Sequence, residues 1–183
     1  IRHALHPLQR RYRVDHLILN RRRLNDTFYT DTLFSKVKSM NGNACAQVYS
    51  NGSFTKVFPM PDKTGARVGQ TLTDFADDVG IPDTLVMDLA PEQAGKHTDM
   101  QKEARRLRVR IRYTEKGRSE QNHTAKGKIG QLKRRWKHRM TTKNVPRCLW
   151  DYGLVHEVEV LSILARGKDQ VPGLEKVLGQ TID

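Results

Sequence analysis

The stretch TLVMD (residues 84–88) decides the class of fold. Four residues that suit a short buried strand are followed at once by Asp88, whose carboxylate is costly to bury without a cation or hydrogen-bond donors. Helical patterns precede and follow this strand. The strand is therefore expected to belong to a sheet that carries helices on its faces, with an acidic residue at the strand end.

Upstream of this strand the pattern predicts a hairpin-rich region and then a helix. Three extended segments cover residues 28–36, 44–49 and 54–60. Asn51-Gly52, between the last two segments, is a strong signal for a two-residue hairpin turn. Residues 63–79 then place apolar side chains at helical spacing, and Gly80 is expected to end that helix.

Downstream the pattern predicts one more strand and three helices. They cover residues 98–107 (helix), 109–113 (strand), 120–140 (helix) and 149–164 (helix). The helix over 120–140 is about 30 Å long at the usual rise, and its apolar residues form one stripe. Trp136 fits that stripe, which favours core packing over base stacking. The element order predicts an α/β fold with a mixed five-stranded sheet flanked by helices, and it resembles the ribonuclease H-like fold.

Charge is concentrated in two basic blocks. The chain has 183 residues and a net charge of +13. Residues 1–24 contain seven Arg and one Asp, and residues 102–147 contain seventeen Lys or Arg and three Glu. Such blocks around an acidic middle favour a polyanionic partner, nucleic acid. The alternative is a generally basic, solvated surface like that of a ribosomal protein.

Cysteine usage and hydropathy indicate the compartment. Cys45 and Cys148 occur in unlike contexts without nearby cysteines, so neither a disulfide framework nor a zinc site is expected. No apolar run approaches the roughly 18 residues of a membrane span. The sequence therefore predicts a nuclear or cytoplasmic protein that has no membrane partner.

A second acidic residue is a candidate partner for Asp88. Asp31 lies within the first extended segment, and 56 residues separate the two aspartates, which leaves room for the hairpin strands and one helix. We therefore expect them at neighbouring positions of the sheet. Such carboxylates suit Mg²⁺ or Mn²⁺, which activate oxygen nucleophiles in phosphoryl transfer. The alternative for Asp31 is an exposed strand aspartate without a ligand.

An ordered set of short motifs carries a family resemblance. The motifs are DTLFS (31–35), FPM (58–60), DVGIP (78–82), EQAG (92–95) after Asp88, QN (121–122) and IGQLK (129–133). Together, from about Arg10 to Ile163, they resemble the integrase catalytic core of long-terminal-repeat (Ty1/copia-like) retrotransposon polyproteins. The resemblance implies residues 1–25 as a basic arm that follows an upstream zinc-binding domain, 26–165 as the catalytic core, and 166–183 as an irregular tail.

The resemblance also implies an Asp, Asp, Glu triad that performs DNA integration. Asp31 and Asp88 match the two aspartates and would bind Mg²⁺ or Mn²⁺, but Lys126 occupies the place of the glutamate, with 37 residues between it and Asp88. At about 4 Å and an effective dielectric near 20, unit charges interact by about 4 kcal/mol, so a lysine there repels a divalent ion. We therefore expect catalysis to be impaired.

Further implied roles concern DNA and assembly. The residues expected to contact DNA are Gln121, Asn122, Lys126, Lys133, Arg134 and Lys137. Gln121 and Asn122 could equally cap the helix. Arg135 and Arg139 of the same helix are also expected to contact phosphates, although all these lysines and arginines could be a merely solvated face. The family also implies a homo-oligomer, for which the helix over 149–164 could serve unless it only completes the core. The alternative function is a non-catalytic nucleic-acid-binding or assembly domain of the same fold.

Overall fold

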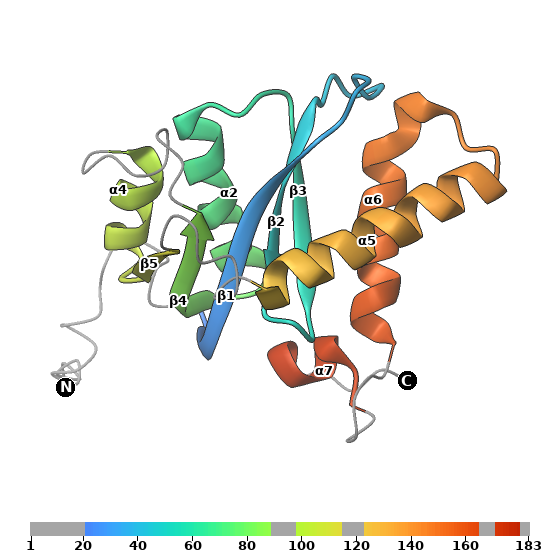
Figure 1. Ribbon diagram of the computed structural model, residues 1–183. Helices are drawn as coiled ribbons and strands as arrows, with labels where there is room; N and C mark the ends of the chain where they lie inside the picture. The colour runs from blue at the N-terminus through green and yellow to red at the C-terminus, as the bar shows by residue number, and fades with distance from the viewer. Residues whose placement is uncertain (1–20, 89–97, 115–122, 165–170, 180–183) are drawn as a thin grey trace, which may run out of the picture.

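A computed structural model describes residues 21–88, 98–114, 123–164 and 171–179, with the side chains of 123–126 excepted. The strands are β1 (Arg23–Phe34), β2 (Cys45–Ser50), β3 (Thr55–Met60), β4 (Ile81–Asp88) and β5 (Arg110–Thr114). The helices are α2 (Gly65–Asp78), α4 (Asp99–Arg106), α5 (His123–Thr142), α6 (Trp150–Ile163) and α7 (Gly173–Leu178), with the 3-10 turn η3 (Arg147–Leu149) before α6. The predicted order of elements is confirmed (Figure 1).

The five strands form one mixed sheet in the order β3-β2-β1-β4-β5. β1 pairs antiparallel with β2, and β2 antiparallel with β3. β4 runs parallel to both β1 and β5. The crossover through α2 explains the parallel pairing, because a strand that returns alongside its neighbour in the same direction needs a long connection. The predicted mixed sheet with flanking helices is confirmed.

Two apolar cores lie on opposite faces of this sheet. The first contains Phe28, Leu85 and Met87 of the central strands and packs them against α2 and α4. Gly69 of α2 makes close packing possible there, because a Cβ at this position would lie 3.1 Å from the backbone carbon of Asp99 in α4. This side of the sheet is a conventional hydrophobic interior.

The second core lies under α5 and α6. Leu33 and Val48 of the sheet meet Leu132 of α5 and the fully buried Trp150 and Leu154 of α6. The helices therefore form a layer on each side of the sheet, with α2 and α4 on one face and α5 and α6 on the other (Figure 1). The predicted apolar stripe of the long helix is confirmed for residues 129, 132, 136 and 140, and Trp136 packs against this core as expected.

The hairpin between β2 and β3 differs from the prediction. Ser50 pairs with Thr55, so the loop has four residues, 51–54, and a two-residue Asn51-Gly52 turn was wrong. Asn51 does not enter the left-handed region; its Oδ1 atom instead accepts hydrogen bonds from the backbone N–H groups of Ser53 and Phe54. An asparagine side chain that bonds its own following backbone is a competing turn chemistry.

The prediction of an irregular tail was wrong for residues 173–178, which form α7. Val177 is buried in the first core. Gly173 allows the approach, because a Cβ there would lie 2.1 Å from the carbonyl oxygen of Ser53. At the other end β1 begins at Arg23, inside the expected arm, and residues 1–20 lie outside the described part of the chain. Among the described residues, no helix combines the length and apolar character of a membrane span.

Candidate functional site

The two predicted acidic residues are brought together by the central strands. The parallel register pairs Tyr29 with Val86 and Thr30 with Met87, and continuing it by one residue sets Asp31 beside Asp88. Neighbouring strands are about 4.8 Å apart at the backbone. The prediction that these aspartates occupy adjacent positions in the sheet is confirmed.

Both aspartates lie on the sheet face that carries α5 and α6. Side chains alternate along a strand, so Asp31 shares the face of Leu33, a member of the second core. Asp88 follows Met87, a member of the first core, so its side chain points to the other face of the sheet. The pair thus occupies the carboxyl end of β4 and the neighbouring part of β1, on one face of the sheet.

The carboxylates are half-buried, and the contacts of each include a hydrogen bond from a neutral donor. The Thr114 hydroxyl, from the paired position on β5, donates to Asp88 Oδ1 at 2.8 Å. The backbone N–H of Thr32 donates to Asp31 Oδ1 at 2.8 Å. The sequence analysis did not identify Thr114 as a residue of the site. Thr114 follows Arg112 by two residues in β5, so the two side chains share a face of the sheet. Carboxylate oxygens are the ligands that hard divalent cations prefer.

A buried polar network supports β1 from the opposite face. The side chain of Gln47 accepts a hydrogen bond from Thr32 Oγ1 at 2.8 Å and donates one to Thr30 Oγ1 at 2.6 Å. The Tyr49 hydroxyl shares a 2.9 Å hydrogen bond with Thr71 of α2, and burial raises the pKa of that phenol. Satisfied polar groups in a core fix one arrangement of the strands. Thr30 and Thr32 bracket Asp31, so the network fixes the backbone that carries the carboxylate.

The position of the expected third ligand is defined for the backbone only. Lys126 lies in the first turn of α5, which begins at His123, so the prediction that it belongs to the long helix is confirmed. Its side chain lies outside the described residues, as do Gln121 and Asn122. Within the described residues no three His, Cys, Asp or Glu side chains gather closely enough to bind a metal ion.

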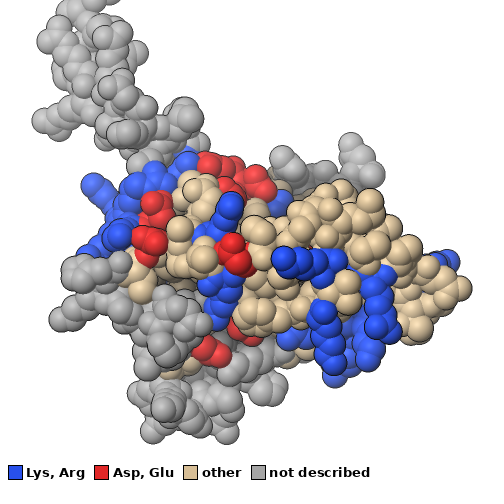
Figure 2. Space-filling view, turned by 90° about the horizontal axis from the view of Figure 1, so that it is seen from above, with Lys and Arg blue, Asp and Glu red and all other residues tan. Residues whose placement is uncertain are grey.

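The basic surface of α5 is divided between two roles. Lys133, Arg134 and Lys137 are exposed and form no ion pair with a described residue. They belong to a helix that lies on the same face as the aspartates, and Lys and Arg side chains project from that side of the molecule (lower right of Figure 2). Their exposure agrees with the DNA-contact expectation but equally with a solvated face.

Two other arginines of α5, Arg135 and Arg139, were also expected to contact phosphates, but the structure pairs them with a carboxylate of the protein. Arg135 Nε and Arg139 Nε each lie 2.6 Å from a carboxylate oxygen of Glu157 on α6, whose side chain is 1% exposed. This acidic residue was missed in the sequence. Its place between Leu154 and Leu161 in the buried stripe of α6 was the signal that could have revealed it.

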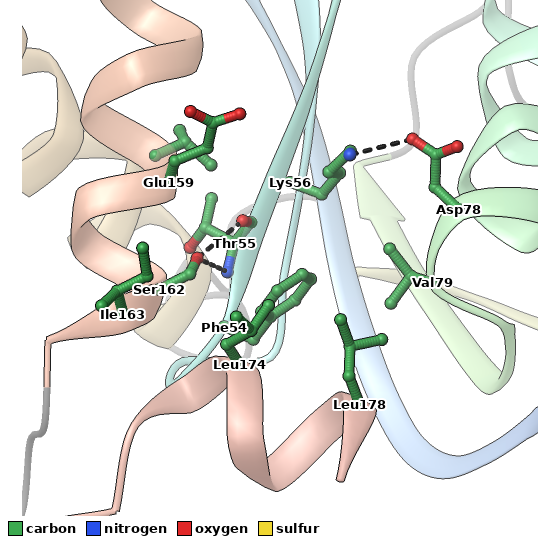
Figure 3. A pocket seen from close by; sticks show the side chains of 11 residues that line it. Phe54, Thr55, Lys56, Asp78, Val79, Glu159, Ser162, Ile163, Leu174 and Leu178 are labelled. Atoms are coloured by element: carbon green, nitrogen blue, oxygen red, sulfur yellow. Dashed lines mark hydrogen bonds and ion pairs between the residues drawn. The ribbon is translucent and has the colours of Figure 1, made fainter. Parts of the chain in front are cut away.

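A groove of about 210 Å³ lies away from the aspartates. Edge strand β3, the end of α2, α6 and α7 line it, and Lys56 spans part of it to reach Asp78 at 2.8 Å (Figure 3). Ser162 of α6 bonds the backbone of Thr55 at its floor. In the sheet order β2 separates this strand from β1, so the groove is distinct from the acidic pair.

Solved structures share this architecture. A chain of the simian T-cell lymphotropic virus intasome, solved in complex with PP2A regulatory subunit B56 gamma, superimposes with a TM-score of 0.68 at 16% identity. The HTLV-2 integrase catalytic core domain, solved in complex with magnesium in a trimeric form, superimposes with a TM-score of 0.64 at 12% identity. The chain has the fold of an integrase catalytic core.

The two superpositions cover most of this chain but different shares of the solved chains. Both cover 84% of this chain. They cover 96% of the HTLV-2 core domain but 55% of the simian virus chain, so this chain spans about half the length of the latter. No model of a protein family and no curated protein sequence matches the chain. The likeness therefore establishes the ribonuclease H-like integrase-core fold, and the chemistry depends on the site itself.

Proposed function

We propose that this chain is the catalytic-core domain of an integrase of the long-terminal-repeat retrotransposon (Ty1/copia-like) type, with an incomplete catalytic triad. The observation that carries the proposal is the placement of Asp31 beside Asp88 on adjacent parallel strands. The integrase-core fold of the solved neighbours and the motifs in the sequence support the same conclusion. The reaction class is phosphoryl transfer between DNA strands. The 3′ hydroxyl oxygen of one DNA end attacks a phosphodiester of the target and forms a new P–O bond, while the bond from that phosphorus to the 3′ oxygen of the target strand breaks.

The two carboxylates fit one hard divalent cation. Mg²⁺ prefers oxygen ligands and often takes one or two carboxylates together with substrate phosphates. Asp31 and Asp88 are half-buried, adjacent and on one face, as such a site requires. The ion, when bound, would polarise the phosphoryl group and activate the attacking oxygen. The magnesium in the HTLV-2 core domain supports this assignment.

Lys126 works against full metal occupancy. An ammonium near the carboxylate pair would replace an attraction for the cation by repulsion of several kcal/mol at an effective dielectric near 20. In this proposal the chain therefore keeps a DNA-binding fold but catalyses poorly. DNA would be held mainly through phosphates, by Gln121, Asn122, Lys126, Lys133, Arg134 and Lys137.

The test restores the glutamate. Strand transfer by Lys126→Glu on a labelled duplex with Mn²⁺ is expected to exceed that of the unsubstituted chain by about a hundredfold or more, the usual scale of an electrostatic catalytic group. Lys128→Glu is the matched control, because it changes the charge equally on the same helix but about 200° around its axis. Equal activity of the unsubstituted chain and Lys126→Glu would contradict the placement of the third ligand.

A second readout does not depend on assembly of a larger complex. Mn²⁺ is expected to raise the melting temperature of Lys126→Glu and to leave that of Lys128→Glu nearly unchanged, because binding to the folded state stabilises it. If neither variant responds to metal or joins strands while both bind DNA, the second candidate takes precedence. That candidate is a non-catalytic DNA-binding or assembly domain, which Lys126 itself favours.

We propose in addition that the chain forms homo-oligomers inside the cell, in the nucleus or cytoplasm. The trimeric HTLV-2 core and the simian virus intasome support assembly. Most apolar residues of α6, including Trp150, Leu154 and Val158, complete the core. The large apolar side chains that stay exposed are Tyr152, at 58%, near the start of the helix, and Ile163 and Leu164, each at 44%, near its end. Sedimentation velocity of the purified chain measures the oligomeric state.

A further inference from the structure

We propose that Arg110 and Arg112 of β5 form a second phosphate-binding track for DNA, on the side of the acidic pair opposite to α5. The proposal rests on the proposed function, since it assumes that the acidic face receives a polynucleotide. It adds a binding surface that the family motifs do not contain. The argument depends on which face of the sheet these arginines occupy, on their partners and on their position relative to Asp88.

The face is fixed by alternation along β5. Ile111 and Tyr113 pack against the first core, on the α2 and α4 side. The residues between and beside them, Arg110, Arg112 and Thr114, therefore point to the opposite face. The 2.8 Å hydrogen bond from Thr114 to Asp88 confirms this face at the end of the strand. The two arginines thus share the surface that carries the acidic pair.

Their distance from the acidic pair follows from the strand register. Thr114 pairs with Asp88, Arg112 with Val86 and Arg110 with Thr84. The arginines therefore lie one and two rows below the row of the carboxylates, at intervals of about 6.7 Å along the strand. The two arginines therefore form a short row of positive charges that leads to Asp88.

Both side chains are available to an anion. Arg110 and Arg112 are exposed and form no hydrogen bond or ion pair with a described residue. Arg23 of β1 provides a contrast, because its guanidinium donates to the carbonyl oxygens of Leu107 and Arg108 at the end of α4. Like charges about 6.7 Å apart on one strand face repel each other, and a bound anion would offset that repulsion.

The sheet order places the acidic pair between two basic flanks. β5 is the edge strand next to β4, whereas α5 covers the sheet at β2, on the far side of β1 (Figure 1). A duplex that presents a phosphodiester to Asp31 and Asp88 extends in both directions from the reacting phosphate. Lys133, Arg134 and Lys137 would contact one arm of that duplex, and the β5 arginines the other.

The test compares DNA affinity by fluorescence anisotropy over a series of KCl concentrations. Replacing both arginines, in Arg110→Gln/Arg112→Gln, is expected to weaken binding to a labelled duplex about tenfold or more near 0.1 M salt. The slope of log K against log salt should decrease in magnitude by about 2, one for each phosphate contact. Arg110→Lys/Arg112→Lys should retain most of the affinity, because lysine also binds phosphate as a point charge.

The matched control is Arg67→Gln/Arg105→Gln. Both residues are exposed, without an ion pair to a described residue, and belong to α2 and α4 on the opposite face. The control loses the same net charge and is expected to bind within about threefold of the unsubstituted chain, because general charge effects are screened within about 10 Å at this salt.

Three other results would overturn this inference, alone or together with the proposed function. If the β5 variant binds as tightly as the control variant, the track is overturned, and the arginines serve only to keep an edge strand from pairing with other chains. If a variant in which Lys133, Arg134 and Lys137 are replaced by Gln loses affinity while the β5 variant does not, the proposed function stands and this inference fails. If the unsubstituted chain does not bind duplex DNA at all, both fail.

Discussion

Two groups of carboxylates on the same side of the sheet differ in their surroundings. Asp151 and Glu157 of α6 are 2% and 1% exposed, and each is held by several donors. Asp31 and Asp88 are half-buried and lie directly beside each other on adjacent strands. A buried acid that arginines or amides surround stabilises the fold, whereas two adjacent acids at a strand end favour a cation from solution. The predictions below test this contrast.

The largest expected effect concerns the acidic pair and activity. In the Lys126→Glu background, Asp88→Asn should abolish strand transfer, a loss of about a hundredfold or more, because one metal ligand is removed. Its unfolding free energy, from urea titration without metal, should change by no more than about 1 kcal/mol, since like charges at adjacent positions are mildly unfavourable. Strand transfer that survives the substitution would remove Asp88 from the site.

The second effect concerns the clamp between α5 and α6. Glu157→Ala should lower the free energy of unfolding by about 3 kcal/mol, because two arginines lose a buried partner and the helix pair loses its cross-link. Arg135 and Arg139 are 38% and 40% exposed, so water limits the loss. Glu159→Ala, two residues further on the exposed side of α6, is the control and should change stability by less than about 0.5 kcal/mol. Equal losses would mean that the clamp contributes nothing specific.

The contribution of Asp151 to the stability of the fold should depend on pH. Burial acts to raise its pKa, but hydrogen bonds from Ser39, Asn43, the Tyr152 backbone and Asn41 outweigh burial and lower it. The charged form is therefore favoured in the folded state. Its contribution to stability is complete above the ordinary aspartate pKa of about 3.9 and disappears as the pH falls through the lowered value.

Asp151→Asn tests this contribution. At pH 7 the variant should lose about 2 kcal/mol, the scale of hydrogen bonds to a charged group. The amide of the new side chain would also face the donors of Asn41 and Asn43. Below about pH 4 its stability should converge with that of the unsubstituted chain in thermal melts. A difference that stays constant down to pH 2.5 would contradict the pKa shift.

The smallest expected effect is direct stabilisation by metal. Mg²⁺ at about five times its dissociation constant should stabilise Lys126→Glu by about 1 kcal/mol, and EDTA should reverse the change. Asp31→Asn in the same background should remove the response, whereas Glu159→Ala should retain it. A response that persists in the Asp31→Asn variant would place the ion elsewhere.

Much of the fold could be predicted because each element carries a local signal. The apolar stripe of α5 and the run before Asp88 made these elements predictable. The β2–β3 hairpin was predicted with the wrong turn because Asn51 bonds its own following backbone, which the dipeptide alone does not indicate. Helix α7 was missed because its order depends on contact with the loop around Ser53, far away in the sequence.

Some residues of the candidate site could likewise be predicted from the sequence, and others could not. Asp31 and Asp88 could be selected from strand position and resemblance, because an acid after an apolar strand is unusual. Thr114, Arg110 and Arg112 could not be assigned to the site, since only the pairing of β5 with β4 brings them there. Glu157 and its arginines lie 22 and 18 residues apart in sequence, and only the packing of α6 on α5 joins them.

The sequence by itself determined the kinds of element, their order, the charge distribution and the presence of Lys126 in place of a carboxylate. These properties are local, because periodicity and residue type act over a few residues. Only the tertiary structure decided which face of the sheet each charge occupies, which arginines have partners and which acids lie side by side. Strand register and helix packing set those relations, and both result from burying apolar surface across the whole chain.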